Sequence, residues 1–268
     1  MHYDLLLTAM MTSHIRGCLK TGKIVPFSDP PRLQEHHLIF ECASHSFISK
    51  FRRAPITTVD AFLKYELSCG LTDVTLYRPQ AGEEYHLYGF SNYGHVAMIC
   101  RYKNGDAAAF VPKWCSPMQG GQPILRFTEN HMVPYDIPKI IYDDNTDRFA
   151  SVLEEITAFA QEIGFSWFAE RYREARDILS GQKPCDPALS LPFMGEKGRR
   201  LVSAANVADL FGGMGSWNDS PPCYAQKAGR ESDYDRLSQA LFDELRAAVL
   251  YAVNHTSIPS PKGENFHE

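Results

Sequence analysis

Residues 146–163, TDRFASVLEEITAFAQEI, decide the fold class of this chain. Apolar side chains in this stretch recur at intervals of three and four residues, which places them on one face of an α-helix. Gly164 follows directly and is expected to end that helix. The sequence therefore predicts an amphipathic helix whose apolar stripe consists of Phe149, Val152, Leu153, Ile156, Phe159, Ala160 and Ile163.

Three more helices are predicted downstream. Ser166 is expected to cap the second helix, which Gly181 ends, and the short connection makes the first two helices antiparallel neighbours. A third helix is expected over about residues 199–211, and a fourth from Ser232. This part of the chain is therefore predicted to be helical.

Residues upstream of Asn145 have a different pattern. They form short runs of β-branched and aromatic residues between turn residues, which is typical of strands. Asn104-Gly105 separates two such runs, 95–103 and 107–111, and predicts a hairpin with a type I′ turn. One helix is expected from the hydroxyl cap at Thr57-Thr58 to Gly70. The other predicted strands are residues 38–43, 74–77, 85–88, 124–127 and 137–142.

The change of hydrophobic period after residue 144 predicts an α+β protein of two domains. Residues 1–144 are expected to form a mainly antiparallel sheet with one helix, and residues 145–268 a helical domain of about four helices. Residues 181–198 hold three prolines and three glycines and are expected to form a long loop. The tail from residue 255 is expected to fray.

Composition excludes several classes of protein. A net charge of −5 supplies no general positive field for a phosphate backbone, so no direct nucleic-acid partner is predicted. The seven cysteines include no C-x-x-C pair, which favours reduced thiols in a cytosol. The apolar run 5–11 follows Asp4 instead of a basic segment, so neither a signal peptide nor a membrane span is predicted. We therefore expect a cytoplasmic location.

A cysteine-dependent hydrolase or transferase is the alternative to a binding protein. Cys115 could act as the nucleophile, with His95 or His131 as the base and Asp136 as the orienting group. With ten histidines and seven cysteines in the chain, a grouping of this kind is also expected by chance. We therefore assign no catalytic residue from the sequence and predict that the chain is not an enzyme.

A metal site is considered next. His37, Glu41 and His45 would share one face of a strand, but their spacing is not that of a zinc-binding helix or knuckle. Histidines on an edge strand explain the pattern without a ligand. We therefore predict no metal and no other cofactor.

The most unusual stretch is LFGGMGSWND at residues 210–219. Its glycines suggest a phosphate-binding loop, but they follow a predicted helix instead of a strand, and no Lys-Ser/Thr pair comes after them. The simpler interpretation is a helix stop followed by a tight turn that its tryptophan anchors to the helices. The residues of this structural motif are Gly212, Gly213, Gly215, Ser216, Trp217, Asn218 and Asp219.

This stretch, together with the paired helices from Phe149 onwards, resembles a family of short, immunity-like bacterial proteins that carry a G-G-M-G-S-[FW]-N-D motif. Ser220-Pro221-Pro222 departs from the apolar residues expected after that motif. The whole chain looks like a cognate immunity protein of a type VI secretion toxin of the nuclease type. The resemblance implies a cytoplasmic antitoxin that binds a toxin domain without turnover.

Charge gives a first indication of where such a partner would bind. Residues 129–177 contain eleven acidic and five basic side chains, an excess that could steer a basic nuclease surface. Acidic helix faces are also commonly just solvated. The residues predicted to bind the partner are Asp143, Asp144, Asp147, Glu154 and Glu155.

Overall fold

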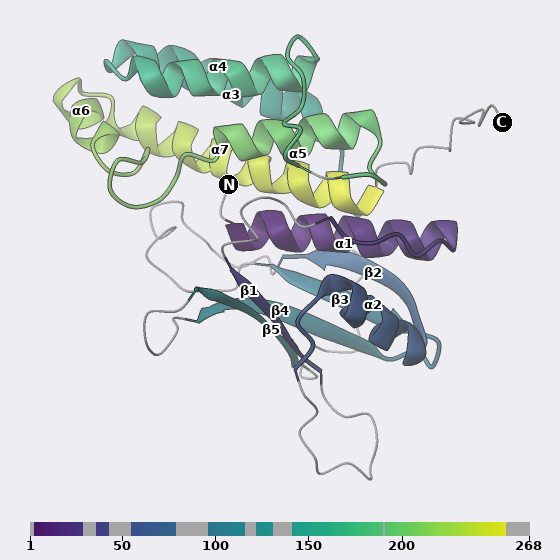
Figure 1. Ribbon diagram of the computed structural model, residues 1–268. Helices are drawn as coiled ribbons and strands as arrows, with labels where there is room; N and C mark the ends of the chain where they lie inside the picture. The colour runs from purple at the N-terminus through teal and green to yellow at the C-terminus, as the bar shows by residue number, and fades with distance from the viewer. Residues whose placement is uncertain are drawn as a thin grey trace.

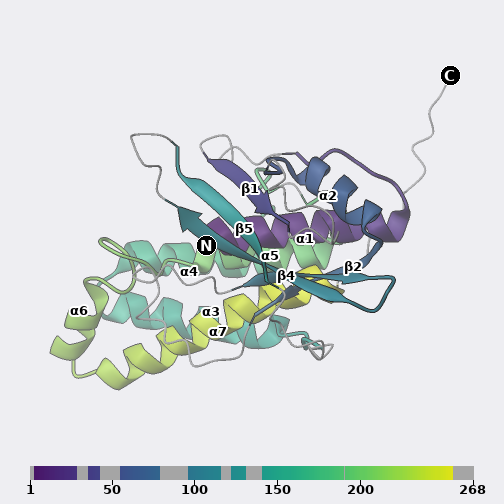
Figure 2. The ribbon, with the colours of Figure 1, turned by 90° about the horizontal axis from the view of Figure 1, so that it is seen from below.

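The chain folds into a sheet and a group of helices on opposite sides of helix α1 (Tyr3–Thr21) (Figures 1 and 2). In the described residues there are five strands and seven helices, with the sheet from the N-terminal half and most helices from the C-terminal half. The predicted α+β class is therefore confirmed. The computed structural model describes residues 3–28, 36–42, 55–78, 96–115, 122–130, 141–189 and 191–255.

The five strands form one mixed sheet in the order β1-β5-β4-β3-β2. Only the pairing of β1 with β5 is parallel, so the prediction of a mainly antiparallel sheet is confirmed. The strand expected at 85–88 lies outside the described residues, as do residues 137–140 of the strand expected at 137–142, whose last two residues are not in a strand. The strands are β1 (His37–Glu41), β2 (Leu71–Tyr77), β3 (Ala97–Tyr102), β4 (Ala107–Cys115) and β5 (Ile124–Asn130).

The hairpin between β3 and β4 is present, but its turn is not of type I′. That turn needs a positive φ at both central residues, whereas Asn104 has a negative φ and Gly105 has a φ of 88°. The Gly105 amide donates to the Tyr102 carbonyl at 3.0 Å, and the Tyr102 amide donates to the Asp106 carbonyl at 3.0 Å. The loop therefore has three residues, and its last residue is a left-handed glycine. Asn104 favours it because its side chain bonds to Asp106.

Helix α2 (Val59–Ser68) is the helix expected upstream of Gly70. The Thr58 hydroxyl accepts a hydrogen bond from the Ala61 amide at 3.2 Å and so caps the first turn. The buried face of α2 packs on the sheet through Phe62, whose ring contacts those of Phe40 and Phe110. Burial of this aromatic group fixes α2 over the centre of the sheet.

Helix α1 corrects the expectation of a single helix in residues 1–144. The apolar run 5–11 has no polar face, because α1 is buried on opposite sides by the sheet and by the C-terminal helices. A helix that is buried on all sides has no single apolar stripe, which is the pattern from which helices are predicted. Its buried hydroxyls, Thr8 and Thr12, donate to carbonyls one turn earlier at 2.6 and 2.7 Å.

Two large hydrophobic clusters lie on the two sides of α1. Leu6 and Met10 belong to the cluster of the C-terminal helices, whereas Met11 and Ile15 belong to the cluster of the sheet and α2. The alternation follows from the helical period, because residues four apart share a face. Helix α1 therefore joins two cores.

The last helix also reaches the edge of the sheet. The Asn254 side chain accepts from the Leu76 amide at 2.9 Å and donates to the Leu76 carbonyl at 2.8 Å, as a neighbouring strand would. Arg16 donates to the carbonyls of Val253 and Asn254. These bonds satisfy both the edge of β2 and the end of the last helix.

The described residues of the C-terminal half form five helices, one more than predicted. The extra helix, α6, has seven residues and starts with Pro221 in its first turn, which is too short for a hydrophobic stripe. Ser166 does not cap as predicted, since Phe165 occupies the N-cap position without a side-chain bond. The five helices are α3 (Thr146–Glu162), α4 (Ser166–Ser180), α5 (Glu196–Ala208), α6 (Pro221–Lys227) and α7 (Glu231–His255).

The segment between α4 and α5 is shorter than the loop predicted at 181–198, because α5 starts at Glu196. Gly181, with a φ of 83°, ends α4 as expected. The tail beyond His255 lies outside the described residues. Among the helices that the structure describes, none is both long and apolar enough to cross a membrane.

Candidate functional site

The glycine motif forms a tight turn between α5 and α6. The Ser216 amide donates to the Gly213 carbonyl at 3.1 Å, and the Asn218 amide donates to the Ser216 hydroxyl at 3.2 Å. Gly215 has a φ of 80°, a conformation that other residues rarely adopt. Its amide donates to the Asp219 carboxylate at 2.8 Å. Local hydrogen bonds therefore fix the shape of the turn.

These bonds argue against the phosphate-binding interpretation of the glycines. The Asp219 carboxylate accepts from the Gly215 amide, which an anionic ligand would need. A negative side chain at this position also repels a phosphate. The Asp219 side chain therefore occupies the place that an anionic ligand would take in this turn.

Trp217 anchors this turn in the helical core. Its side chain is fully buried, and its indole N–H donates to the Ser238 hydroxyl at 2.8 Å. Tyr234 stacks on it and donates its phenolic O–H to the Trp217 carbonyl at 2.8 Å. Phe168 and Tyr172 of α4 contact the indole edge-on. The motif therefore combines a buried tryptophan that fixes its position with a turn that faces solvent.

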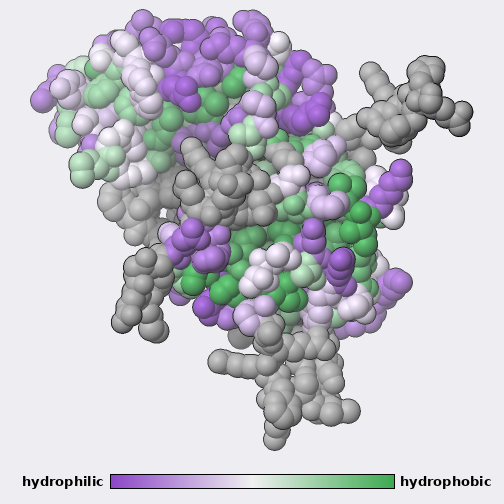
Figure 3. Space-filling view, in the orientation of Figure 1, coloured by the Kyte–Doolittle hydropathy of each residue, from purple (hydrophilic) through white to green (hydrophobic). Residues whose placement is uncertain are grey.

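Three exposed apolar side chains lie at this end of the helical half. Met214, three residues before Trp217, is 98% exposed, while Trp167 and Tyr224 are 57% and 51% exposed. The side chains of Trp167, Met214 and Tyr224 are called the bundle-end surface below. Helix α6 and the start of α4 meet at this end, where Figure 3 shows pale green and white atoms between purple ones (Figures 1 and 3).

The predicted partner-binding acids lie on α3 and the segment before it, and some are neutralised within the chain. Asp144 forms an ion pair with Lys197 of α5. This ammonium and the two donors of Thr146 lower the pKa of Asp144 to about 2. Asp143 and Asp147 are exposed, with no ion pair to another described residue. Only part of this acidic segment is therefore open to a partner.

The two glutamates of α3 that were predicted to bind the partner, Glu154 and Glu155, are also paired. Glu155 lies 3.2 Å from Arg236 of α7, and Glu154 lies 3.9 Å from Arg176 of α4. All four side chains are largely exposed, so the pairs contribute little to stability. They do reduce the local negative potential that the sequence count predicts. The assignment of the five acids to partner binding stays a prediction.

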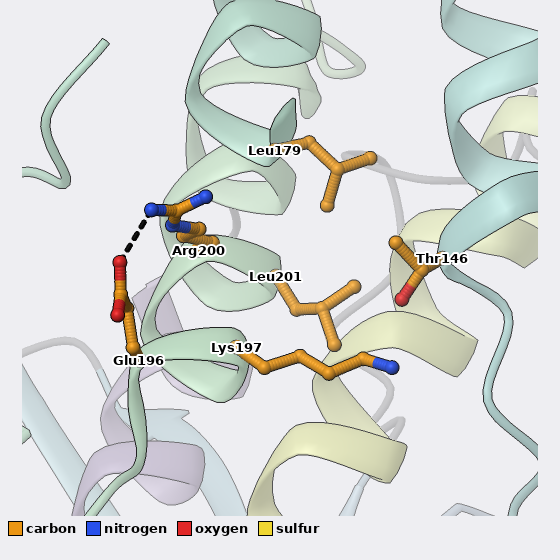
Figure 4. A pocket seen from close by; sticks show the side chains of 6 residues that line it. All are labelled: Thr146, Leu179, Glu196, Lys197, Arg200 and Leu201. Carbon is orange, nitrogen blue, oxygen red and sulfur yellow. Dashed lines mark hydrogen bonds and ion pairs between the residues drawn. The ribbon is translucent and has the colours of Figure 1, made fainter. Parts of the chain in front are cut away.

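A pocket of about 350 Å³ lies between α3, α4 and α5, next to these acids. Figure 4 shows Leu179 and Leu201 on its apolar side and the stem of Lys197 running toward Thr146. Arg200 forms an ion pair with Glu196, and Lys197 forms one with Asp144. Both cations of the pocket are thus already balanced by carboxylates, which leaves no charge for a ligand to recognise.

The cysteine-dependent alternative is not settled by the structure. Cys115 lies half-buried at the end of β4, and its thiol is 3.9 Å from the Lys113 carbonyl. Both candidate bases, His95 and His131, lie outside the described residues, as does Asp136. The proposed cysteine–histidine pairing therefore stays a prediction.

A buried carboxyl group in the sheet half was missed by the sequence reasoning. Glu66 on the inner face of α2 is 1% exposed and accepts from the Tyr102 hydroxyl at 2.6 Å and from the Cys42 thiol at 3.7 Å. Burial raises the pKa of Glu66 to about 7, although the Tyr102 hydrogen bond opposes the shift. The only sequence signal is its position, because Glu66 follows Phe62 and Leu63 on the apolar face.

This cluster does not form a catalytic pair. Burial raises the pKa of the Cys42 thiol, so the reactive thiolate is disfavoured. No group of three or more metal-ligating side chains is found among the described residues. Of the metal candidates, Glu41 bonds to Arg126 at 2.7 Å, and His45 is not among the described residues.

Comparison with protein-family models, with curated proteins and with solved structures finds no match to this chain. Function must therefore be argued from the residues and their arrangement.

Proposed function

We propose that this chain is an immunity protein that binds a cognate secreted toxin in the bacterial cytoplasm and neutralises it stoichiometrically. The observation that carries the proposal is the LFGGMGSWND turn, in which Trp217 is fully buried and Met214 is 98% exposed. The same motif carries the resemblance to immunity-like bacterial proteins.

The turn has the physical properties of a binding element. A fully exposed methionine contributes almost nothing to folding, so the Met214 side chain is free to contact a partner. Methionine is enriched at protein interfaces because its flexible thioether adapts to irregular pockets. A turn that is already ordered also loses little conformational entropy when a partner binds.

A nuclease-type toxin suits the charge of this protein. A nuclease needs a basic surface to hold a phosphate backbone, and this chain carries a net charge of −5. Opposite charges on the two proteins raise the association rate, and salt reduces this gain because it screens the charges. This complementarity supports a toxin that acts on nucleic acid.

Co-expression tests the proposal directly. The full chain is expressed together with each secreted effector encoded beside its gene, and cell survival is measured. We expect rescue from one effector and a 1:1 complex of the chain with a catalytically inactive form of that effector. Unrelated effectors serve as the control. Loss of viability in every pairing, with no complex at micromolar concentration, would refute the proposal.

A further inference from the structure

We infer that the bundle-end surface is the docking surface for the toxin, and that it fits a basic protein surface containing an apolar pocket that receives Met214. This inference rests on the proposed function and assigns it a contact surface. It also places the contact away from the acids of α3 that charge counting alone selects.

Two of the three side chains, Trp167 and Tyr224, belong to one continuous aromatic cluster. The ring centroids of Tyr224 and Phe165 lie 5.0 Å apart, and those of Phe165 and Phe168 lie 5.9 Å apart. The ring centroids of Trp167 and Phe168 lie 4.9 Å apart, and those of Phe168 and the buried Trp217 lie 5.2 Å apart. Met214 lies three residues before Trp217, in the turn that the Trp217 indole anchors to this cluster.

This support makes the surface suitable for recognition. Aromatic side chains that are half-exposed and held by neighbouring rings offer a large contact area and have little freedom to lose. Lys227 lies over the Tyr224 ring at 5.1 Å and limits its motion further. Methionine at the tip supplies the single adaptable contact.

Charge identifies the kind of partner. Residues 162–170 and 212–233, which build this end, contain five acidic and two basic side chains. Arg230 pairs with Glu162 and Asp233, so the three acids Glu170, Asp219 and Glu231 stand against Lys227 outside this group. The surroundings of the apolar side chains are therefore negative, and a basic partner surface complements them.

The other exposed apolar side chains lack this combination. Ile24 and Val25 are 53% and 38% exposed and precede the undescribed residues 29–35. Ile141 is 76% exposed and follows the undescribed residues 131–140. None of them belongs to an aromatic cluster recorded among the described residues, whereas the bundle-end surface lies wholly within described chain.

A matched pair of substitutions tests the surface. Met214→Lys and Ile141→Lys each replace an exposed apolar side chain by a cation, and neither disturbs the core. For the complex with the catalytically inactive toxin, we expect Met214→Lys to raise Kd about 30-fold or more, as at an interface hot spot. Ile141→Lys is expected to change Kd less than about threefold. Titration calorimetry measures both.

Protection of cysteine thiols from labelling tests the same surface a second time and needs no substitution. Cys223 is exposed beside Tyr224 on α6, and Cys185 lies in the segment after α4, at the other end of the helices (Figure 1). A bulky maleimide is reacted with the free chain and with the complex. We expect toxin binding to slow labelling of Cys223 at least tenfold and to leave Cys185 unchanged.

The outcomes separate the surface from the function. A toxin complex that tolerates Met214→Lys and leaves Cys223 reactive overturns the surface but keeps the proposed function. Binding that is lost with Ile141→Lys instead places the contact at the start of α3. A wild-type chain without a toxin complex overturns both. A homodimer of the free chain that Met214→Lys dissociates assigns the surface to a second copy and also overturns the inference.

Discussion

The Trp217 cluster on one side of α1 and the Glu66 cluster on the other differ in whether they contain a buried carboxyl group. On the helical side, the buried Trp217 is satisfied by neutral partners, Ser238 and Tyr234, and the ion pairs around α3 lie at the surface. On the sheet side, an ionisable carboxyl, Glu66, is buried between a tyrosine and a cysteine. Burial of a neutral network leaves stability independent of pH, whereas burial of a carboxyl makes stability depend on pH.

This difference bears on the proposed function. The motif turn is held by groups that do not titrate near neutral pH, because burial raises the pKa of Tyr234 further above its ordinary value. The bundle-end surface should therefore keep its shape over a wide pH range. The sheet half, which contains Glu66, should therefore respond more strongly to pH between about 4.5 and 7.

The largest expected effect is the loss of Trp217. Trp217→Ala leaves a large cavity among the rings of Phe168, Tyr172 and Tyr234 and removes the indole donor to Ser238, so we expect a loss of about 3–5 kcal/mol in the free energy of unfolding. The matched control is Trp167→Ala, at a side chain 57% exposed, with an expected loss below about 1 kcal/mol. Urea denaturation measures both. Equal losses would show that the turn is not anchored through Trp217.

The second effect concerns Glu66 and has a defined sign. Its pKa is raised to about 7 in the folded chain from its ordinary value of 4.5, so the folded state retains the proton between these values. Wild-type stability should fall as pH rises from about 4.5 through 7 and then level off. The span corresponds to roughly 3 kcal/mol at most, at 1.36 kcal/mol per pKa unit.

Glu66→Gln removes this slope, since glutamine has no proton to lose. We expect the variant to gain stability over wild type at pH 8 and not at pH 4.5. The exposed Glu154→Gln serves as control and should leave the pH profile unchanged. Urea denaturation at pH 4.5, 6, 7 and 8 measures the profiles. A wild-type profile that is flat across this range would contradict the burial of an ionisable group.

The smallest effect is expected at the exposed pair of Asp144 and Lys197. The pKa of Asp144 is lowered to about 2, so its contribution is present above the ordinary value of 3.8 and lost as pH falls toward 2. Because the pair is solvent-exposed, Asp144→Asn should cost less than about 1 kcal/mol at pH 7. Thermal unfolding at low and high salt measures it. A loss above 2 kcal/mol would mean that the pair is structural, like the Trp217 network.

Local patterns predicted those elements that local energetics decide. The amphipathic stripe of α3 and the hairpin at Asn104-Gly105 were correctly located, because helical period and turn chemistry act over a few residues. Helix α1 was missed since burial on both sides removes its stripe. The parallel pairing of β1 with β5 was also out of reach, because His37 and Ile124 are far apart in sequence.

The candidate site shows the same division. The motif was recognised, but its open side depends on which residues surround it in space. Counting charges selected five acids on α3 and the segment before it. The pairing of three of them with Lys197, Arg176 and Arg236 depends on three other helices. An ion pair between helices depends on packing, which no local pattern specifies.

The sequence by itself determined the α+β class, the helical second half and the tight turn at LFGGMGSWND, since each follows from side-chain period or backbone preference. Only the tertiary structure decided that Trp217 is buried while Met214 faces solvent, and that Glu66 is enclosed beneath α2. The physical reason is that exposure and pKa depend on neighbours brought together by folding, and these neighbours lie tens of residues away along the chain.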